Sequence, residues 1–167
     1  LGVQVREARR GQVGPTLEGQ TCPCCSQLVK LYRRKLSVRM VEGLVRLYLV
    51  HNRVAAGTLR DPENVIRDPN GTIWIRHDLF AELGERNYSL LRFWGLMVPR
   101  DTRTATDNAS GFWSITTEGV YFVLGKLAVP EYVYVFNNTM HSVSAEKVLI
   151  EDVHERFNYA ELMKGVP

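Results

Sequence analysis

Three cysteines lie close together in the segment TCPCCSQLVKLY, which begins at Thr21. Cys22 and Cys25 have the CxxC spacing that brings two thiolates to one tetrahedral metal ion, as in one half of a zinc ribbon. A closed structural site needs two further ligands, and the chain contains no second CxxC. Cys24 is the next candidate, although it directly precedes Cys25. Zinc is therefore the cofactor that this segment suggests.

Three interpretations of these cysteines remain open. In the first, Cys22, Cys24, Cys25 and one distant histidine bind Zn²⁺ within one chain. In the second, two chains share an ion and each supplies Cys22 and Cys25. In the third, the thiols bind no metal. A redox-active CxxC is not expected, because the flanking sequence is basic and lacks the alternating strand and helix pattern of thioredoxin-like proteins.

Basic residues are concentrated in the first part of the chain. Residues 1–60 contain 11 of the 21 lysines and arginines but only 3 of the 18 acidic residues. Such an imbalance is typical either of a protein with a polyanionic partner or of one whose charge only serves solubility. The densest run is KLYRRK, in which Arg33, Arg34 and Lys35 are candidates for contacts with a phosphate backbone. The alternative is a basic linker that is simply solvated.

No group of residues forms a recognisable catalytic motif. The chain lacks a glycine-rich phosphate loop, GxSxG and HExxH, and its acidic residues have no paired spacing. We therefore expect a binding protein and not an enzyme.

Length and composition indicate one principal hydrophobic core. The chain has 167 residues, of which 45% are apolar and 23% are charged, and these are ordinary values for a globular domain. No apolar stretch is long enough to cross a membrane, and the N-terminal residues do not have the pattern of a signal peptide. These features predict a soluble, cytoplasmic protein without a membrane partner.

The pattern of apolar residues predicts the elements that position these groups. Helical spacing predicts a helix over residues 38–52, capped by Ser37. A strand is expected at residues 72–75, a short helix at 79–84 and a second helix at 86–98. A polar loop (100–110) separates these from a strand at 111–116 and a helix that Thr117 caps. A β-hairpin is expected within residues 131–153, with a turn in Asn137–Thr139, and a short helix at 158–165.

This order of elements resembles the winged-helix DNA-binding fold of the MarR and PadR type. The segments LLRFWGLMVP, RDTRTATDNAS and FWSITTEG correspond to the second helix with its GL step, the wing, and the strand that ends in an LTxxG-like pattern. The chain is also similar to small phage and plasmid proteins that join a cysteine pair to such a domain. The resemblance implies an α+β protein with a basic, cysteine-bearing extension (1–36), a winged helix-turn-helix core (37–128) and a C-terminal β-hairpin with a short helix (129–167).

The resemblance also implies a function and a set of contacts with double-stranded DNA. The second helix of such a pair enters the major groove, and the wing lies on phosphate or in the minor groove. The residues implied on this helix are Arg86, Asn87, Tyr88, Ser89 and Arg92, and those in the wing are Arg100 and Arg103. A homodimer that reads paired half-sites and regulates transcription or replication is expected. The alternative is a winged-helix docking module or a phage-type modulator of a host protein complex.

Overall fold

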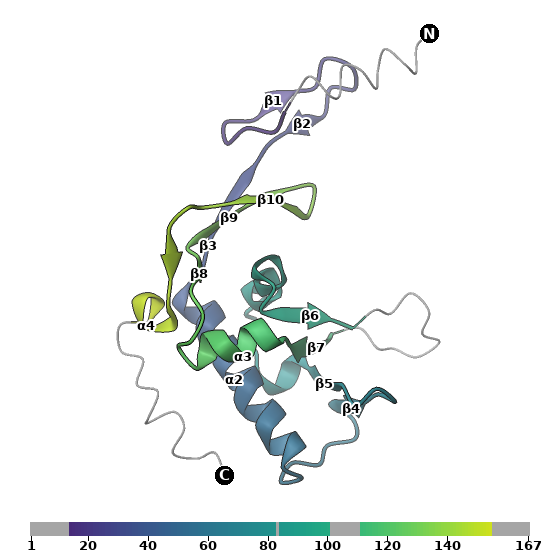
Figure 1. The fold of residues 1–167 in the computed structure, drawn as a ribbon. Helices are drawn as coiled ribbons and strands as arrows, with labels where there is room; N and C mark the ends of the chain where they lie inside the picture. Colours follow the sequence, from purple (N-terminus) through teal and green to yellow (C-terminus); the bar gives the residue numbers. More distant parts are fainter. Residues whose placement is uncertain (1–13, 83, 101–110, 155–167) are drawn as a thin grey trace. The chain divides into compact units, whose positions relative to one another are not determined.

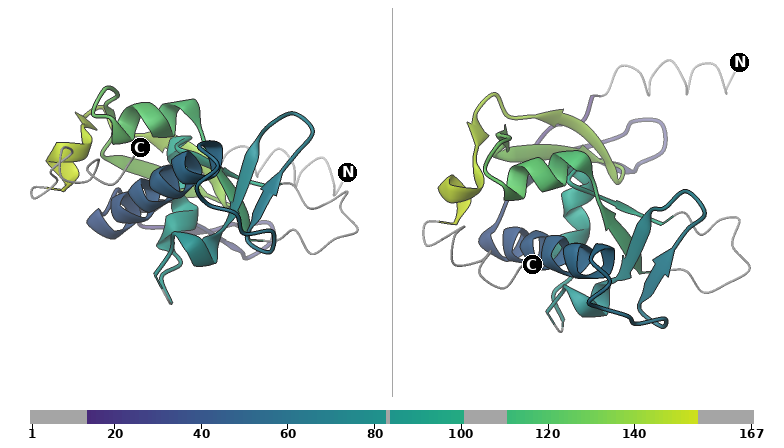
Figure 2. Two further views of the ribbon diagram at one scale, coloured as in Figure 1. Left: turned by 90° about the horizontal axis from the view of Figure 1, so that it is seen from below. Right: turned by 60° about the horizontal axis from the view of Figure 1, so that its bottom comes forward.

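The computed structural model describes residues 14–82, 84–100 and 111–154, and the chain divides into two compact units. Unit 1 consists of Leu1–Lys35 and Pro130–Glu146, and unit 2 consists of Leu36–Val129 and Lys147–Pro167. Both units contain antiparallel β-sheet, and the long helix belongs to unit 2 (Figures 1 and 2). The protein is therefore of the α+β class that the sequence predicts.

Helix α2 (Val38–Ala55) supplies much of the core of unit 2. Ser37 caps it, and the Ser37 hydroxyl accepts a hydrogen bond of 3.3 Å from the backbone N–H of Met40. The predicted helix is confirmed and continues three residues beyond the expected end at Asn52. Its apolar face is buried, and this burial stabilises the helix more than its intrinsic propensity does. The buried side chains of this face include Met40, Val41, Leu44, Val45, Leu47, Tyr48 and Val54.

A four-stranded antiparallel sheet lies against α2. Its strands are β4 (Val65–Arg67), β5 (Ile73–Arg76), β6 (Met97–Pro99) and β7 (Phe112–Ile115), in the order β4-β5-β7-β6. Helix α2 packs against β5 and β7. Every residue of β7 is buried, as is typical of a central strand. The strand expected at residues 72–75 is confirmed, whereas the sequence analysis expected no strand at the position of β4.

The β4–β5 connection owes its shape to the carboxylate of Asp68. One carboxylate oxygen accepts 2.9 Å hydrogen bonds from the backbone N–H groups of Asn70 and Thr72, and the other accepts a 3.1 Å bond from the indole N–H of Trp74. These bonds, that of Trp74 first, lower the pKa of Asp68 below its ordinary value. An aspartate that bonds the backbone ahead of it mimics a turn. The turn closes the pair Ile66↔Trp74 and allows β4 to form.

We expect this hairpin to lose stability in acid. The pKa of Asp68 is lower in the folded chain than in the unfolded chain, so the carboxylate stabilises the fold above the unfolded value of about 3.9. This contribution disappears as the pH falls through the lowered folded value. The Trp74 indole N–H resonance should shift over this acid range in the wild type, and Asp68→Asn should remove the titration. An indole resonance that is unchanged on acidification would contradict the assignment.

The segment between β5 and β6 forms two 3₁₀ helices, η1 (His77–Leu79) and η2 (Asn87–Trp94). The sequence predicts α-helices here, with the second extending to Val98, and this is wrong in type and length. A 3₁₀ helix has three residues per turn, so Tyr88, Leu91 and Trp94 lie on one side. Leu91 is fully buried and Trp94 is 9% exposed. The helix ends at Gly95, whose positive φ of 70° favours glycine, and the chain then enters β6.

Helix α3 (Thr117–Val123) follows β7 directly and packs against α2. Its N-cap is Thr116 and not the predicted Thr117. The Thr116 hydroxyl accepts a 3.0 Å bond from the N–H of Gly119 and donates a 2.6 Å bond to the carbonyl oxygen of Gly95. The backbone N–H of Thr116 donates to the carbonyl oxygen of Leu96 at 3.2 Å. The end of η2 and the start of α3 are therefore joined directly.

Unit 1 contains two small sheets. Strands β1 (Gln20–Thr21) and β2 (Leu28–Val29) form a hairpin, and β3 (Tyr32–Lys35), β9 (Tyr132–Phe136) and β10 (Thr139–Val143) form a sheet in the order β10-β9-β3. The expected hairpin is confirmed. Asn137 and Asn138 have φ values of 52° and 61°, which a two-residue type I′ turn requires. Strand β3 was not expected, and it pairs with β9 across a large sequence separation.

Three shorter elements complete the described residues. Strands β8 (Val129–Pro130) and β11 (Lys147–Val148) pair where the chain leaves and re-enters unit 2, and α4 (Ile150–Val153) follows them. Within the described ranges, no helix combines the length and the apolar character that crossing a membrane requires. Of the expected wing at residues 100–110 the structure describes Arg100 alone, and the helix expected at 158–165 lies outside the described residues.

Candidate nucleic-acid interface and thiol cluster

The start of η2 places two of the expected DNA contacts at the surface. Arg86 and Asn87 are exposed, and the backbone N–H of Asn87 donates a 2.7 Å bond to a carboxylate oxygen of Glu85. Ser89 and Arg92 are half-buried. The hydroxyl of Ser89 donates to the Arg86 carbonyl oxygen at 2.9 Å, and the guanidinium of Arg92 lies 4.8 Å from the centre of the Phe93 ring. Only Arg86 and Asn87 are therefore fully presented to a partner.

Tyr88 has a packing role between η1, η2 and β7. Its ring stacks on His77 with a centroid distance of 6.0 Å, and it meets Phe80 and Trp113 edge-on at 5.3 and 5.7 Å. Burial is the main reason that the pKa of the Tyr88 hydroxyl is raised above its ordinary value, and the charge of Asp78 adds to this. Tyr88 therefore holds η2 against His77, Phe80 and Trp113. The sequence analysis named it as a DNA contact and did not suggest this packing role.

A cleft of about 900 Å³ lies between η1 and η2, with Arg86 among the residues that line it. Asp78, Glu82 and Glu85 also line it. Each carboxylate forms an ion pair with an arginine from another position: Arg76 with Asp78 at 2.9 Å, Arg46 with Glu82 at 2.9 Å and Arg39 with Glu85 at 3.7 Å. Among the described residues, Arg86 has no carboxylate within ion-pair distance, so its charge is available to a ligand.

The basic strand β3 belongs to unit 1 and exposes all of its residues. Side chains alternate along a strand, so Arg33 and Lys35 share one face of the sheet and Arg34 lies on the other. Arg33 and Lys35 lie 5.0 and 5.8 Å from the centre of the Tyr132 ring, and Arg34 lies 5.7 Å from that of Tyr32. Lys35 also pairs with Glu131 at 3.5 Å. The three side chains predicted to contact phosphate are thus divided between the two faces of this sheet.

Tyr132 is a part of this surface that the sequence analysis missed. Its ring supports two cations at once, and a cation over an aromatic face is stabilised by about 0.5–1 kcal/mol when exposed. The alternation in EYVYVF contained the signal, because it placed Tyr132 and Tyr134 on one face of a strand. The sequence did not show that the strand beside Tyr132 is the basic strand β3.

Arg100 is another expected contact, and it is half-buried after β6. Arg103 lies outside the described residues.

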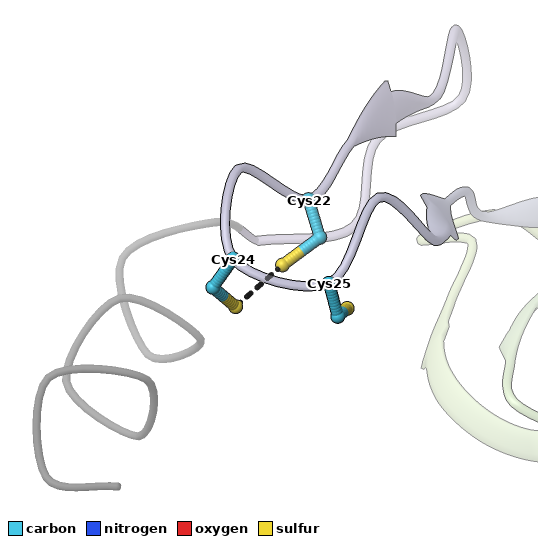
Figure 3. A group of neighbouring side chains, drawn as sticks. All are labelled: Cys22, Cys24 and Cys25. Carbon is cyan, nitrogen blue, oxygen red and sulfur yellow. Dashed lines mark hydrogen bonds between the residues drawn. The ribbon is translucent and has the colours of Figure 1, made fainter. Parts of the chain in front are cut away.

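The three cysteines lie on the loop between β1 and β2 (Figure 3). The loop closes through a 2.8 Å bond from the Cys22 N–H to the Gln27 carbonyl oxygen and a 2.9 Å bond from the Ser26 N–H to the Cys22 carbonyl oxygen. Cys22 is 3% exposed, Cys24 is half-buried and Cys25 is exposed. Their three sulfur atoms lie within 4.8 Å of one another, and those of Cys22 and Cys24 are 3.0 Å apart.

Hydrogen bonds within the loop favour the thiolate of Cys22. The Cys24 thiol contributes most, followed by the backbone N–H groups of Cys24 and Cys25, and together they lower the pKa of Cys22 to about 7. The same interaction with Cys22 raises the pKa of the Cys24 thiol. The loop therefore holds one readily ionised sulfur beside two others, which is an arrangement suited to binding a soft metal ion.

Comparisons of the chain with protein-family models, with curated proteins and with solved structures find no match.

Proposed function

We propose that this chain is a non-enzymatic DNA-binding protein in which unit 2 acts as a winged helix-turn-helix domain similar to those of the MarR and PadR type. Its role would be regulation of transcription or replication. The 3₁₀ helices η1 and η2 take the place of the helix pair, and the expected wing belongs to the segment between β6 and β7, most of which lies outside the described residues.

The observation that carries this proposal is the strand order β5-β7-β6. In a winged-helix domain, the strand before the helix pair lies beside the strand that returns from the wing. Here β5 precedes η1 and η2, and it pairs with β7 through Ile75↔Trp113. Strand β7 pairs on its other side with β6 through Val98↔Ser114. This connectivity supports the proposal.

The hydrogen bonds that Thr116 forms with Gly95 and with Gly119 give further support. These two glycines belong to the GL step and to the ITTEG segment that suggested the resemblance. Thr116 joins the two segments through its bonds to Gly95 and Gly119. The short motif therefore has a physical basis, because it fixes η2 relative to the strand that returns from the loop.

DNA would be contacted mainly through Arg86 and Asn87. Arginine forms paired hydrogen bonds with guanine and asparagine with adenine, and both side chains also bind phosphate. The carboxylates in the adjoining cleft would repel phosphate, so the contact is confined to the exposed start of η2. The basic side chains of β3 would add affinity without sequence preference. A homodimer would place two such surfaces on paired half-sites.

The test is the binding of a labelled random duplex measured by fluorescence anisotropy over a range of salt concentrations. We expect the logarithm of the binding constant to fall linearly with the logarithm of the salt concentration. Arg86→Ala should weaken binding about tenfold and lower the slope by about 1 if Arg86 lies on phosphate. Arg60→Ala is the matched control, because Arg60 is an exposed arginine of the same unit outside the proposed surface.

Two results would contradict this proposal. If Arg86→Ala binds like the wild type while Arg33→Ala/Arg34→Ala loses binding, the contact belongs to unit 1 and the role of η2 is wrong. If the wild type does not bind at low salt, DNA binding itself is wrong.

A protein-docking function is the second candidate, and one observation favours it. Tyr32, Met140 and Val143 lie on the same face of the β10-β9-β3 sheet, since they pair with Val135 or Val133, and each is 45–46% exposed. Grouped apolar side chains at a surface are typical of protein interfaces. A wild type that does not bind the duplex would make this face the site to investigate.

A further inference from the structure

Three sulfur atoms from one short loop of unit 1 lie within 4.8 Å of one another. The loop spans residues 22–27 and contributes Cys22, Cys24 and Cys25 (Figure 3). Among the described histidine, cysteine, aspartate and glutamate side chains, these three form the group whose ligand atoms are close enough to hold one metal ion. We propose that Cys22, Cys24 and Cys25 bind one Zn²⁺ per chain as three thiolates, with water as the fourth ligand.

The distances fit a tetrahedral zinc ion. A Zn–S bond is about 2.3 Å long, so two sulfur ligands of a tetrahedral ion lie about 3.8 Å apart. The sulfur atoms here all lie within 4.8 Å of one another, and the closest pair, Cys22 and Cys24, is separated by 3.0 Å. Small rotations of the side chains are enough to move these atoms to the required spacing. The neighbouring positions of Cys24 and Cys25 therefore do not prevent both from binding one ion.

The backbone of the loop is already arranged for a metal ligand. The hydrogen bonds between Cys22, Ser26 and Gln27 close the loop and hold this arrangement. Thiolate ligands favour soft or borderline ions such as Zn²⁺ over Mg²⁺ or Ca²⁺. Each thiol that binds as a thiolate releases its proton, so three cysteines release up to three protons per ion.

A zinc ion bound at this site would stabilise the β1–β2 hairpin of unit 1. Strands β1 and β2 contain only two residues each, and an isolated hairpin of this size is marginal in water. Zinc bound at the turn would hold the two strands together, because metal binding is coupled to folding in small domains. Cys25 is exposed, so water reaches the site and would supply the fourth ligand. This site does not depend on DNA binding by unit 2.

The experiment is a titration of the full-length, fully reduced protein with Co²⁺ and then Zn²⁺, followed by visible absorption and by elemental analysis after dialysis. We expect one metal ion per chain, with thiolate-to-cobalt charge-transfer bands and tetrahedral d–d bands that Zn²⁺ abolishes. Loss of an outer partner alone costs about 10–100-fold in metal affinity. Cys24→Ser removes a ligand, so we expect it to weaken binding at least about 100-fold.

Two control variants make the result specific. Ser26→Ala lies in the same loop and removes no ligand, so it should bind as the wild type does. His141→Ala tests the histidine of unit 1 as a fourth ligand, and it too should leave the affinity unchanged. Circular dichroism establishes that each variant is folded before its affinity is compared.

Three outcomes would overturn the proposal. Half an ion per chain, with Cys24→Ser unaffected, would mean a site shared by Cys22 and Cys25 of two chains. A large loss of affinity in His141→Ala would mean that a histidine completes the site. Neither bound metal nor cobalt bands in the reduced protein would mean that the three residues are thiols without a metal function.

Discussion

Alanine at position 119 is expected to destabilise unit 2 by about 3 kcal/mol, near the upper end of the range for overpacked sites. Gly119 lies in the first turn of α3, and a Cβ atom built on it would overlap the carbonyl oxygen of Leu96 and lie 2.8 Å from Cγ1 of Ile115. The carbonyl cannot move away freely, because it accepts the N–H of Thr116. The added methyl group would therefore separate α3 from the end of η2.

Gly43 is the matched control for this prediction. It is also a buried helical glycine of unit 2, but a Cβ atom there would meet only Cβ of Tyr88, at an ordinary 3.7 Å. Gly43→Ala should therefore stabilise the protein by about 0.5–1 kcal/mol, because alanine loses less conformational freedom than glycine when the helix forms. Urea unfolding curves of the two variants should move in opposite directions. Equal midpoints for the two variants would show that the backbone at Leu96 moves to make room for a Cβ atom at position 119.

Phe122→Ala is expected to cost about 3–5 kcal/mol, the range for truncation of a buried aromatic residue. Phe122 is fully buried on α3, the helix that packs against α2. Because small domains are stable by only about 5–15 kcal/mol, this loss would remove a large fraction of the total. Thermal unfolding followed by circular dichroism measures the effect.

Tyr121→Ala provides the control for Phe122→Ala. It removes an aromatic ring from the same helix, one residue earlier, where the side chain is 48% exposed. Its effect should stay within about 0.5 kcal/mol, as for most surface substitutions. Two variants of equal stability would contradict the packing of α3 on its buried face.

The sequence predicted the elements whose signals are local. Helix α2 was recognised from its apolar spacing and from Ser37, and the β9–β10 hairpin from alternating residues and from Asn137–Asn138. Both depend on residues within a few positions of one another. The cap of α3 was misplaced by one residue, because both Thr116 and Thr117 are good caps and only the contact with Gly95 distinguishes them.

The elements that the sequence analysis missed depend on distant partners. The sequence analysis interpreted the residues of β3 as phosphate contacts or as a solvated basic linker. All four are exposed, and only their pairing with β9 makes them a strand. Helix η2 has an apolar pattern that fits both helix types, and its packing against distant residues through Tyr88 is not visible in the sequence. For the same reason, the sequence identified Arg86 as a surface residue but did not reveal the ion pairs of its acidic neighbours with Arg39 and Arg46.

Strands β3 and β9 are far apart in the sequence, so their sheet in unit 1 forms only late in synthesis. Arg33 pairs with Tyr134, so β3 leaves the ribosome before its partner exists. Translation of the intervening segment of about 100 residues takes roughly 5–20 seconds at 5–20 residues per second. Throughout this interval the backbone N–H and C=O groups of residues 32–35 lack their partners in β9, and they would pair with other nascent chains. The consecutive charges of Arg33, Arg34 and Lys35 repel an identical strand, and they thereby protect the chain from aggregation until β9 is made.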